Sequence, residues 1–89
     1  SYFYHVKESE VVISGSGTVT LQNDFMPVVP VVITTGETAF SWRIGEDTYE
    51  KSVSAGTWEF PEMELGAGEN RLSVKGEGVT TFRYREGRL

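Results

Sequence analysis

The chain has 89 residues and a mass of 9.9 kDa, the size of a single domain with a small core. Thirteen acidic and eight basic residues give a net charge of −5, which argues against binding to nucleic acid or to an anionic membrane. Because the sequence contains no cysteine, disulfides, thiolate metal sites and cysteine nucleophiles are excluded. We expect neither a membrane helix nor a signal peptide, because no apolar run approaches the length of a membrane helix and the first residues lack the basic-then-apolar pattern of a signal peptide.

Short runs of β-branched and aromatic residues alternate with turn residues along the whole chain, a pattern typical of a β-sandwich or barrel. Within these runs, apolar and polar residues alternate with period 2, and no long segment has the spacing of an amphipathic helix. We therefore expect an all-β domain over residues 1–89, a β-sandwich of two antiparallel sheets. The expected strands are Phe3–His5, Glu10–Ile13, Thr18–Gln22, Val28–Thr34, Ala39–Ile44, Thr48–Val53, Trp58–Phe60, Arg71–Lys75 and Val79–Arg85.

The same alternation predicts which side chains form the core. Both tryptophans alternate in register with neighbouring apolar residues, so core positions are favoured over an exposed position where they could stack on a sugar. The residues expected to be enclosed between the sheets are Phe40, Trp42, Trp58, Leu72, Val74 and Phe82.

The run from Val28 to Ile33 is apolar on both faces and so departs from the alternation. Pro27 and Pro30 cannot donate a ladder hydrogen bond, which favours an edge strand protected against further pairing. Two interpretations are open: the second apolar face completes the core, or it forms a docking surface in which Val28 and Val32 contact a partner.

The two strands expected at 71–75 and 79–85 are separated by the glycine-rich link 76–78, which predicts a β-hairpin. Residues 71–89 carry a net charge of +3, whereas residues 1–70 carry −8. The basic residues expected on the outward face of this hairpin are Arg71, Lys75, Arg83 and Arg85. They either stabilise the sheet through cross-strand charge pairs or form a docking edge for an acidic neighbour.

Catalytic and metal chemistry find little support in the sequence. His5 is the single histidine, so a multi-histidine metal site cannot form, and no nucleophile elbow accompanies it. Glu62 and Glu64 indicate a solvated acidic edge rather than a glycosidase pair, and Asp24 and Asp47 lack the spacing of a calcium loop. We expect no enzyme, no catalytic residue, no cofactor and no metal.

One family resemblance covers about three quarters of the chain. An early Asn23, then Pro30 leading an apolar strand to Gly36, precede a closing segment with the sequence Gly-Glu-Asn-Arg-Leu-Ser-Val at 68–74. A glycine turn and a final strand with Tyr84 and Arg85 follow. In these features the chain resembles the C-terminal domain of siphophage distal tail proteins, the baseplate hub family of phages and prophages of Gram-positive bacteria.

The resemblance implies a function in virion structure. It implies that the two-sheet antiparallel β-sandwich is of galectin-like or jelly-roll type and lies at the C-terminal end of a longer chain. A first residue other than Met also favours this second expectation. A separate N-terminal domain would build a hexameric ring, while this domain would contact other tail or baseplate proteins. The protein would be made in the bacterial cytoplasm and located at the tail tip of the virion, and this domain alone would be a monomer. The asparagines and glycines would shape turns, the asparagines through left-handed backbone. The alternative function is a carbohydrate-binding module for a host-surface saccharide.

Overall fold

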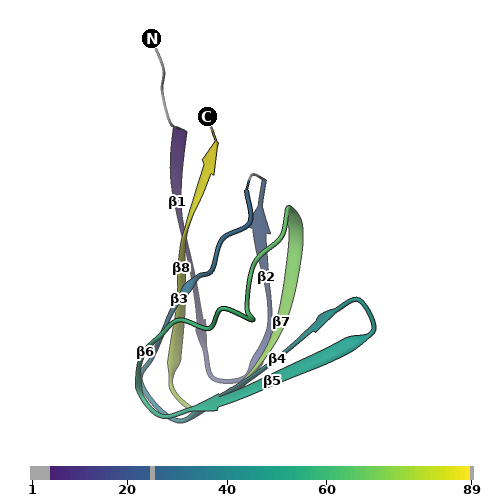
Figure 1. Ribbon diagram of the computed structural model, residues 1–89. Coiled ribbons are helices and arrows are strands. Elements are labelled where there is room, and N and C mark those ends of the chain that lie inside the picture. Colours follow the sequence, from purple (N-terminus) through teal and green to yellow (C-terminus); the bar gives the residue numbers. More distant parts are fainter. Residues whose placement is uncertain (1–4, 25, 89) are drawn as a thin grey trace.

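The computed structural model describes residues 5–24 and 26–88, with side chains described for 8–24 and 26–85. This part of the chain forms two antiparallel four-stranded sheets packed face to face, so the predicted all-β sandwich is confirmed. Sheet A has the strand order β1-β8-β3-β6 and sheet B the order β2-β7-β4-β5 (Figure 1). The strands are β1 (His5–Ser14), β2 (Gly17–Asn23), β3 (Val31–Thr34), β4 (Thr38–Ile44), β5 (Asp47–Val53), β6 (Gly56–Trp58), β7 (Gly68–Gly76) and β8 (Val79–Arg88).

The inward-facing residues of both sheets form the core between them. The ring centroid of Phe40, in sheet B, lies 5.9 Å from that of Phe82, in sheet A, in an edge-to-face arrangement. It lies 6.2 Å from the ring centroid of Phe60, which follows β6. Trp42, Leu72 and Val74 are buried as expected, whereas Trp58 is only half-buried at the margin of the core. The period-2 alternation therefore identified the inner faces of the strands correctly.

The predicted hairpin between 71–75 and 79–85 is wrong, because β7 lies in sheet B and β8 lies in sheet A. The short glycine-rich link carries the chain from one sheet to the other. A side chain at Gly76 would place its Cβ 2.8 Å from the carbonyl oxygen of Glu37, and one at Gly78 would lie 2.5 Å from Thr35 Oγ1. Glycine is therefore needed here because the β3–β4 and β7–β8 connections cross in close contact.

The chain changes sheet at every described connection except the β4–β5 hairpin, which turns at Gly45 with a φ of 63°. This hairpin leans away from the body of the sandwich toward the lower right of Figure 1. At the opposite end, β1 and β8 form a long two-stranded ribbon in which His5 is opposite Arg88. The expected strands 3–5 and 10–13 correspond there to the single strand β1, and Phe3 lies outside the described residues.

The edge strand predicted at 28–34 is also wrong. β3 begins only at Val31 and lies inside sheet A, where its backbone pairs with β8 on one side and with β6 on the other. Pro30 is buried immediately before the strand, so its missing N–H costs no ladder bond. Val28 instead exchanges two backbone hydrogen bonds with Leu65, at 3.1 and 2.7 Å.

Candidate docking surface

The residues proposed from sequence for docking do not form one surface. Val32 is completely buried in the core and cannot contact a partner, so this candidate is wrong. Val28 is half-buried and its backbone is paired with the 59–67 connection. The exposed apolar residues of sheet A lie elsewhere: Val12 on β1 is 54% exposed and Val79 on β8 is 38% exposed. Val31 and Ile33 are half-buried on the outer face of β3.

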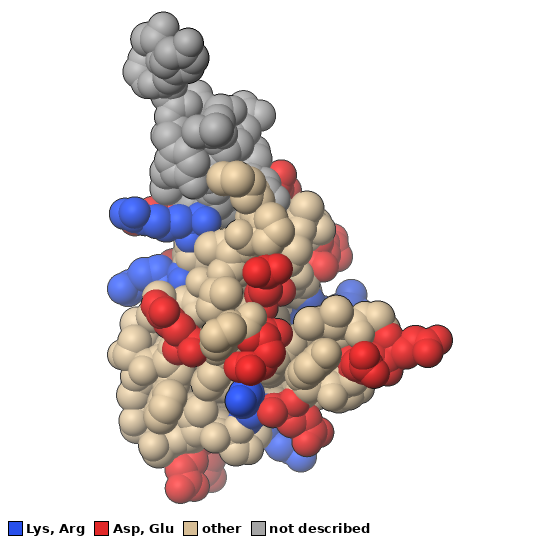
Figure 2. Space-filling view, in the orientation of Figure 1, with Lys and Arg blue, Asp and Glu red and all other residues tan. Residues whose placement is uncertain are grey.

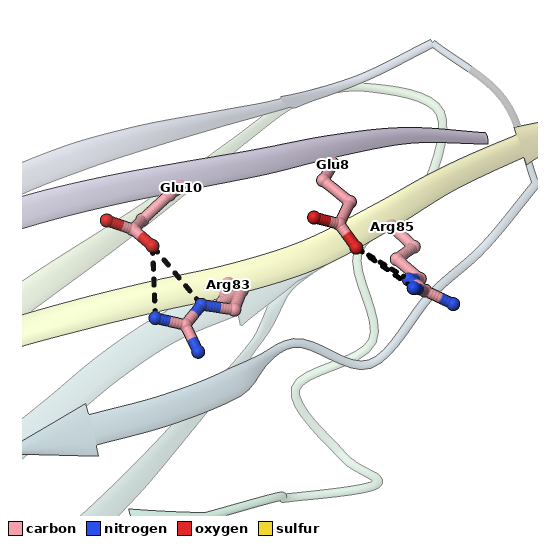
Figure 3. Close-up of polar contacts among 4 residues, drawn as sticks. All are labelled: Glu8, Glu10, Arg83 and Arg85. Carbon is pink, nitrogen blue, oxygen red and sulfur yellow. Dashed lines mark hydrogen bonds and ion pairs between the residues drawn. The ribbon is translucent and has the colours of Figure 1, made fainter.

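Arg83 and Arg85 lie on the outer face of sheet A, where each is paired with an acidic residue on β1 (Figure 3). Arg83 Nη2 is 3.1 Å from Glu10 Oε2, and its Nε donates to the same oxygen at 3.2 Å. Arg85 Nη2 and Nε donate to Glu8 Oε1 at 2.9 and 3.1 Å. Both pairs join residues directly opposite in the β1–β8 register, so these cations are neutralised within the domain.

Arg71 and Lys75 lie on the outer face of sheet B, and neither forms an ion pair with another described residue. The basic stripe expected from sequence is therefore divided between two opposite faces of the molecule, because β7 and β8 belong to different sheets. Arg43 on β4 is a third exposed cation on the same outer face, again without an ion pair among the described residues. Arg43 was not among the predicted docking residues, because a single arginine in an acidic segment gives no recognisable sequence pattern.

Sheet B splits between β4 and β7. The β4–β7 ladder ends where Trp42 pairs with Leu72, although β4 continues to Ile44 and β7 already begins at Gly68. The next pair would place Arg43 directly opposite Arg71, and like charges in that position destabilise a ladder. The two strands instead diverge, as the angle between β7 and the β4–β5 hairpin in Figure 1 shows.

The split leaves an open groove of about 470 Å³, which we call the β4–β7 groove. Its polar wall on the outer side contains the two arginines and the hydroxyls of Ser41 and Ser73, which are opposite each other in the ladder. Two acidic side chains, Glu64 and Glu69, line it as well. The groove therefore combines both charges with small hydroxyl side chains.

The hairpin carries apolar surface beside this groove. Ile44 lines it and is 49% exposed. Trp42 also lines it but is only 7% exposed, because its ring stacks on Tyr49 at 5.9 Å and its Nε1 donates to the Glu62 carbonyl at 3.2 Å. The groove consequently offers an aliphatic contact rather than an open indole face.

The connection from β6 to β7 closes the inner side of the groove and is held by polar side chains. Asn70 donates to the carbonyl oxygens of Leu21, Gly66 and Gly68 at 3.1, 2.9 and 3.2 Å, and accepts from the Gly66 N–H at 3.1 Å. Lys51 lies 3.7 Å from Glu62 and over the ring of Phe60, so it also fixes this connection.

The remaining chemistry-bearing residues are dispersed. His5 begins β1, and its side chain lies outside the described part. Among the described residues, no three acidic or histidine side chains lie close enough together to bind a metal ion. The described segments likewise include no helix with the length and apolarity needed to cross a membrane.

Figure 2 shows acidic side chains spread over the visible face and standing at the outer end of the β4–β5 hairpin.

Comparison with known proteins adds no relative: no family model, curated protein or solved structure matches the chain at a significant level.

Proposed function

We propose that this domain is a non-enzymatic structural module of a phage or prophage tail, presenting a protein-docking surface at the tail tip or baseplate. The observation that carries the proposal is the role of the asparagines that underlie the resemblance. Asn23 is completely buried and donates to the carbonyl oxygens of Met26 and Leu65, and Asn70 holds the connection before β7. Residues with this structural role fit a scaffold better than a catalyst.

The fold supports the same proposal. A sandwich of two four-stranded antiparallel sheets is the architecture expected of the galectin-like domain in distal tail proteins. Arg43, Arg71 and Lys75, on the outer face of sheet B, are the cations left available to a partner in the described part of the chain. In this proposal they replace the divided basic stripe as the docking surface.

The proposal is tested by locating the domain in assembled particles. Antibodies raised against the purified domain, detected with gold, are applied to phage particles induced from the bacterium that encodes the chain. We expect label at the tail tip, with no label on particles from a strain in which the gene is deleted. Label confined to cell-envelope fragments, with unlabelled tails, would overturn the proposal.

A saccharide-binding module is the second candidate. The β4–β7 groove combines arginine, glutamate and hydroxyl side chains, which can bind sugar hydroxyls, and Tyr49 beside it is 37% exposed. One face of Tyr49 is covered by Trp42, so stacking on a sugar is restricted. A Trp58→Phe variant leaves Trp42 as the single indole; a saturable change in its emission with purified cell-wall polysaccharide would favour this function over docking.

The proposal also includes the oligomeric state. The hexameric ring is assigned to a separate N-terminal domain, so the domain alone is expected to be a monomer near 9.9 kDa. Light scattering across a tenfold dilution series measures this directly. A stable hexamer of the isolated domain would show that ring formation lies in the sandwich itself.

A further inference from the structure

We propose that the β4–β7 groove binds a single carboxylate side chain on an extended segment of a partner protein, held between Arg43 and Arg71. This inference rests on the proposed docking function and names the surface and the chemistry of the partner. It depends on three features of the described chain: two unpaired arginines, two open strand margins and an exposed aliphatic side chain.

The arginines are the first feature. Both line the groove, both are exposed, and neither has an ion-pair partner among the described residues, whereas Arg83 and Arg85 are each paired across the ladder. They lie at adjacent positions on the strands that diverge, so their guanidinium groups flank the same opening. A carboxylate between them would accept charge-assisted hydrogen bonds from both, and it would relieve the repulsion that separates the two strands.

The strand margins are the second feature. Residues 43–44 of β4 have ladder partners only on β5, and residues 68–71 of β7 have partners only on β2. The Gly68 carbonyl accepts from the Asn70 amide, but the other backbone groups that these residues direct toward the groove are available to a segment that runs along it. An extended chain satisfies such groups by adding to a strand, which makes an extended segment the preferred form of the partner.

The third feature sets the residue type beside the carboxylate. Ile44 is 49% exposed and lies on the strand margin next to Arg43. Since successive side chains of an extended segment point to opposite sides, a carboxylate toward the arginines places its neighbour toward Ile44. The partner segment should therefore carry an aliphatic residue next to the acidic one, where it can contact Ile44.

Glu64 and Glu69 restrict the charge of the ligand. Both line the groove, so the four charged side chains there sum to zero. A single carboxylate interacts with the two arginines, whereas an acidic tract that runs along the groove also brings carboxylates next to the two glutamates. Inorganic phosphate, for its part, lacks the backbone groups that pair with the strands. The groove should therefore prefer one carboxylate on an extended segment to inorganic phosphate or to an acidic tract.

The test is a titration of the ¹⁵N-labelled domain followed by amide and arginine Nε–H chemical shifts. The probes are a capped pentapeptide of valine and threonine with one central glutamate, the same peptide with glutamine, and inorganic phosphate. We expect the glutamate peptide to shift the signals of Arg43, Ile44 and Arg71, and to bind about tenfold more tightly than the glutamine peptide. Phosphate should bind more weakly than the glutamate peptide.

Variants locate the effect. Arg43→Gln and Arg71→Gln should each reduce the affinity for the glutamate peptide about tenfold, and the unperturbed signals report whether the variant is folded. Arg83→Gln, on the opposite face of the sandwich, should retain the affinity. Equal binding of the two peptides, or loss of binding in Arg83→Gln but not in the Arg43 and Arg71 variants, would overturn the inference.

The peptide titration and the gold-labelling experiment have independent outcomes. Gold label at the tail tip combined with no peptide binding would leave the structural role standing and refute the groove as its docking site. Peptide binding by a domain that is absent from phage tails would support the groove as a carboxylate site and refute the structural role in the tail.

Discussion

The side-chain amide of Asn70 connects segments that are far apart in the sequence. It bonds to Leu21 on β2, 49 positions away, and to Gly66 and Gly68 beside it. The family resemblance implied that asparagine would serve here through a left-handed backbone, but positive φ occurs only at glycines in the described part. The amide itself, with two donors and one acceptor, is the property that the fold uses.

Replacing this amide should therefore loosen the β6–β7 connection. We expect Asn70→Ala to lower the free energy of unfolding by about 1–2 kcal/mol, because half-buried backbone carbonyls lose their donors. Urea denaturation followed by tryptophan emission measures the change. Glu69→Ala, at the exposed neighbouring position, is the matched control and should change stability by less than about 0.5 kcal/mol. Equal effects of the two variants would show that the amide contributes nothing specific.

The exposed ion pairs on sheet A should contribute much less. The Arg83 and Glu10 side chains are 56% and 52% exposed, so water and salt screen their attraction. A double-mutant cycle of Arg83→Gln and Glu10→Gln should give a coupling of about 0.2–1 kcal/mol that decreases in high salt. A coupling that is unchanged in 1 M salt would contradict this account, because screening should weaken an exposed pair.

Two connections that cross at one end define the sandwich at the scale of its elements. Gly76 and Gly78 pack against residues 35–37, and Thr35 Oγ1 accepts a 2.8 Å bond from the Val79 N–H. The Thr35 N–H in turn donates to the Val79 carbonyl at 3.0 Å. The two links are hydrogen-bonded to each other. These bonds therefore fix the place where the chain passes between the sheets, from β3 to β4 and from β7 to β8.

A methyl group at this crossing should be costly. Gly76→Ala places Cβ 2.8 Å from the Glu37 carbonyl oxygen, a backbone atom that cannot rotate away, so we expect a loss of about 1–3 kcal/mol in unfolding free energy. Gly66→Ala is the control, since nothing lies within 4 Å of its added Cβ and its φ is not positive. Thermal unfolding of both variants measures the difference, and equal midpoints would refute the steric explanation.

The same crossing explains why strand pairing was harder to predict than strand content. Alternation placed Leu72, Val74 and Phe82 on inner faces correctly, because an inner face depends on the strand's own sequence. A Gly-Glu-Gly link is equally compatible with a hairpin and with a change of sheet, and only contact with residues 35–37 decides between them. The β4–β7 groove was unpredictable for a related reason: it arises where two strands distant in sequence would bring Arg43 and Arg71 together.

Across the whole molecule, Phe40 joins the two sheets. It is 1% exposed and its ring contacts those of Phe60 and Phe82. We expect Phe40→Ala to remove about 3–5 kcal/mol, a large share of the roughly 5–15 kcal/mol that keeps a small domain folded. Val12→Ala, at a 54% exposed site, should be nearly neutral in the same denaturation experiment. A folded, cooperative Phe40→Ala variant of unchanged stability would mean that the core lies elsewhere.

The pairing of β1 with β8 has a consequence for the order of folding. Glu8 and Arg85 are 77 positions apart in the sequence, and β8 is the inner strand that joins β1 to β3. On the ribosome, β2, β4, β5 and β7 emerge before β8, so sheet B can form while sheet A still lacks its central strand. Closing so long a loop is slow, and domains with such distant pairings fold in roughly milliseconds to seconds. During that interval the inner face of sheet B remains uncovered, which makes the nascent chain a substrate for chaperones that bind exposed apolar strands.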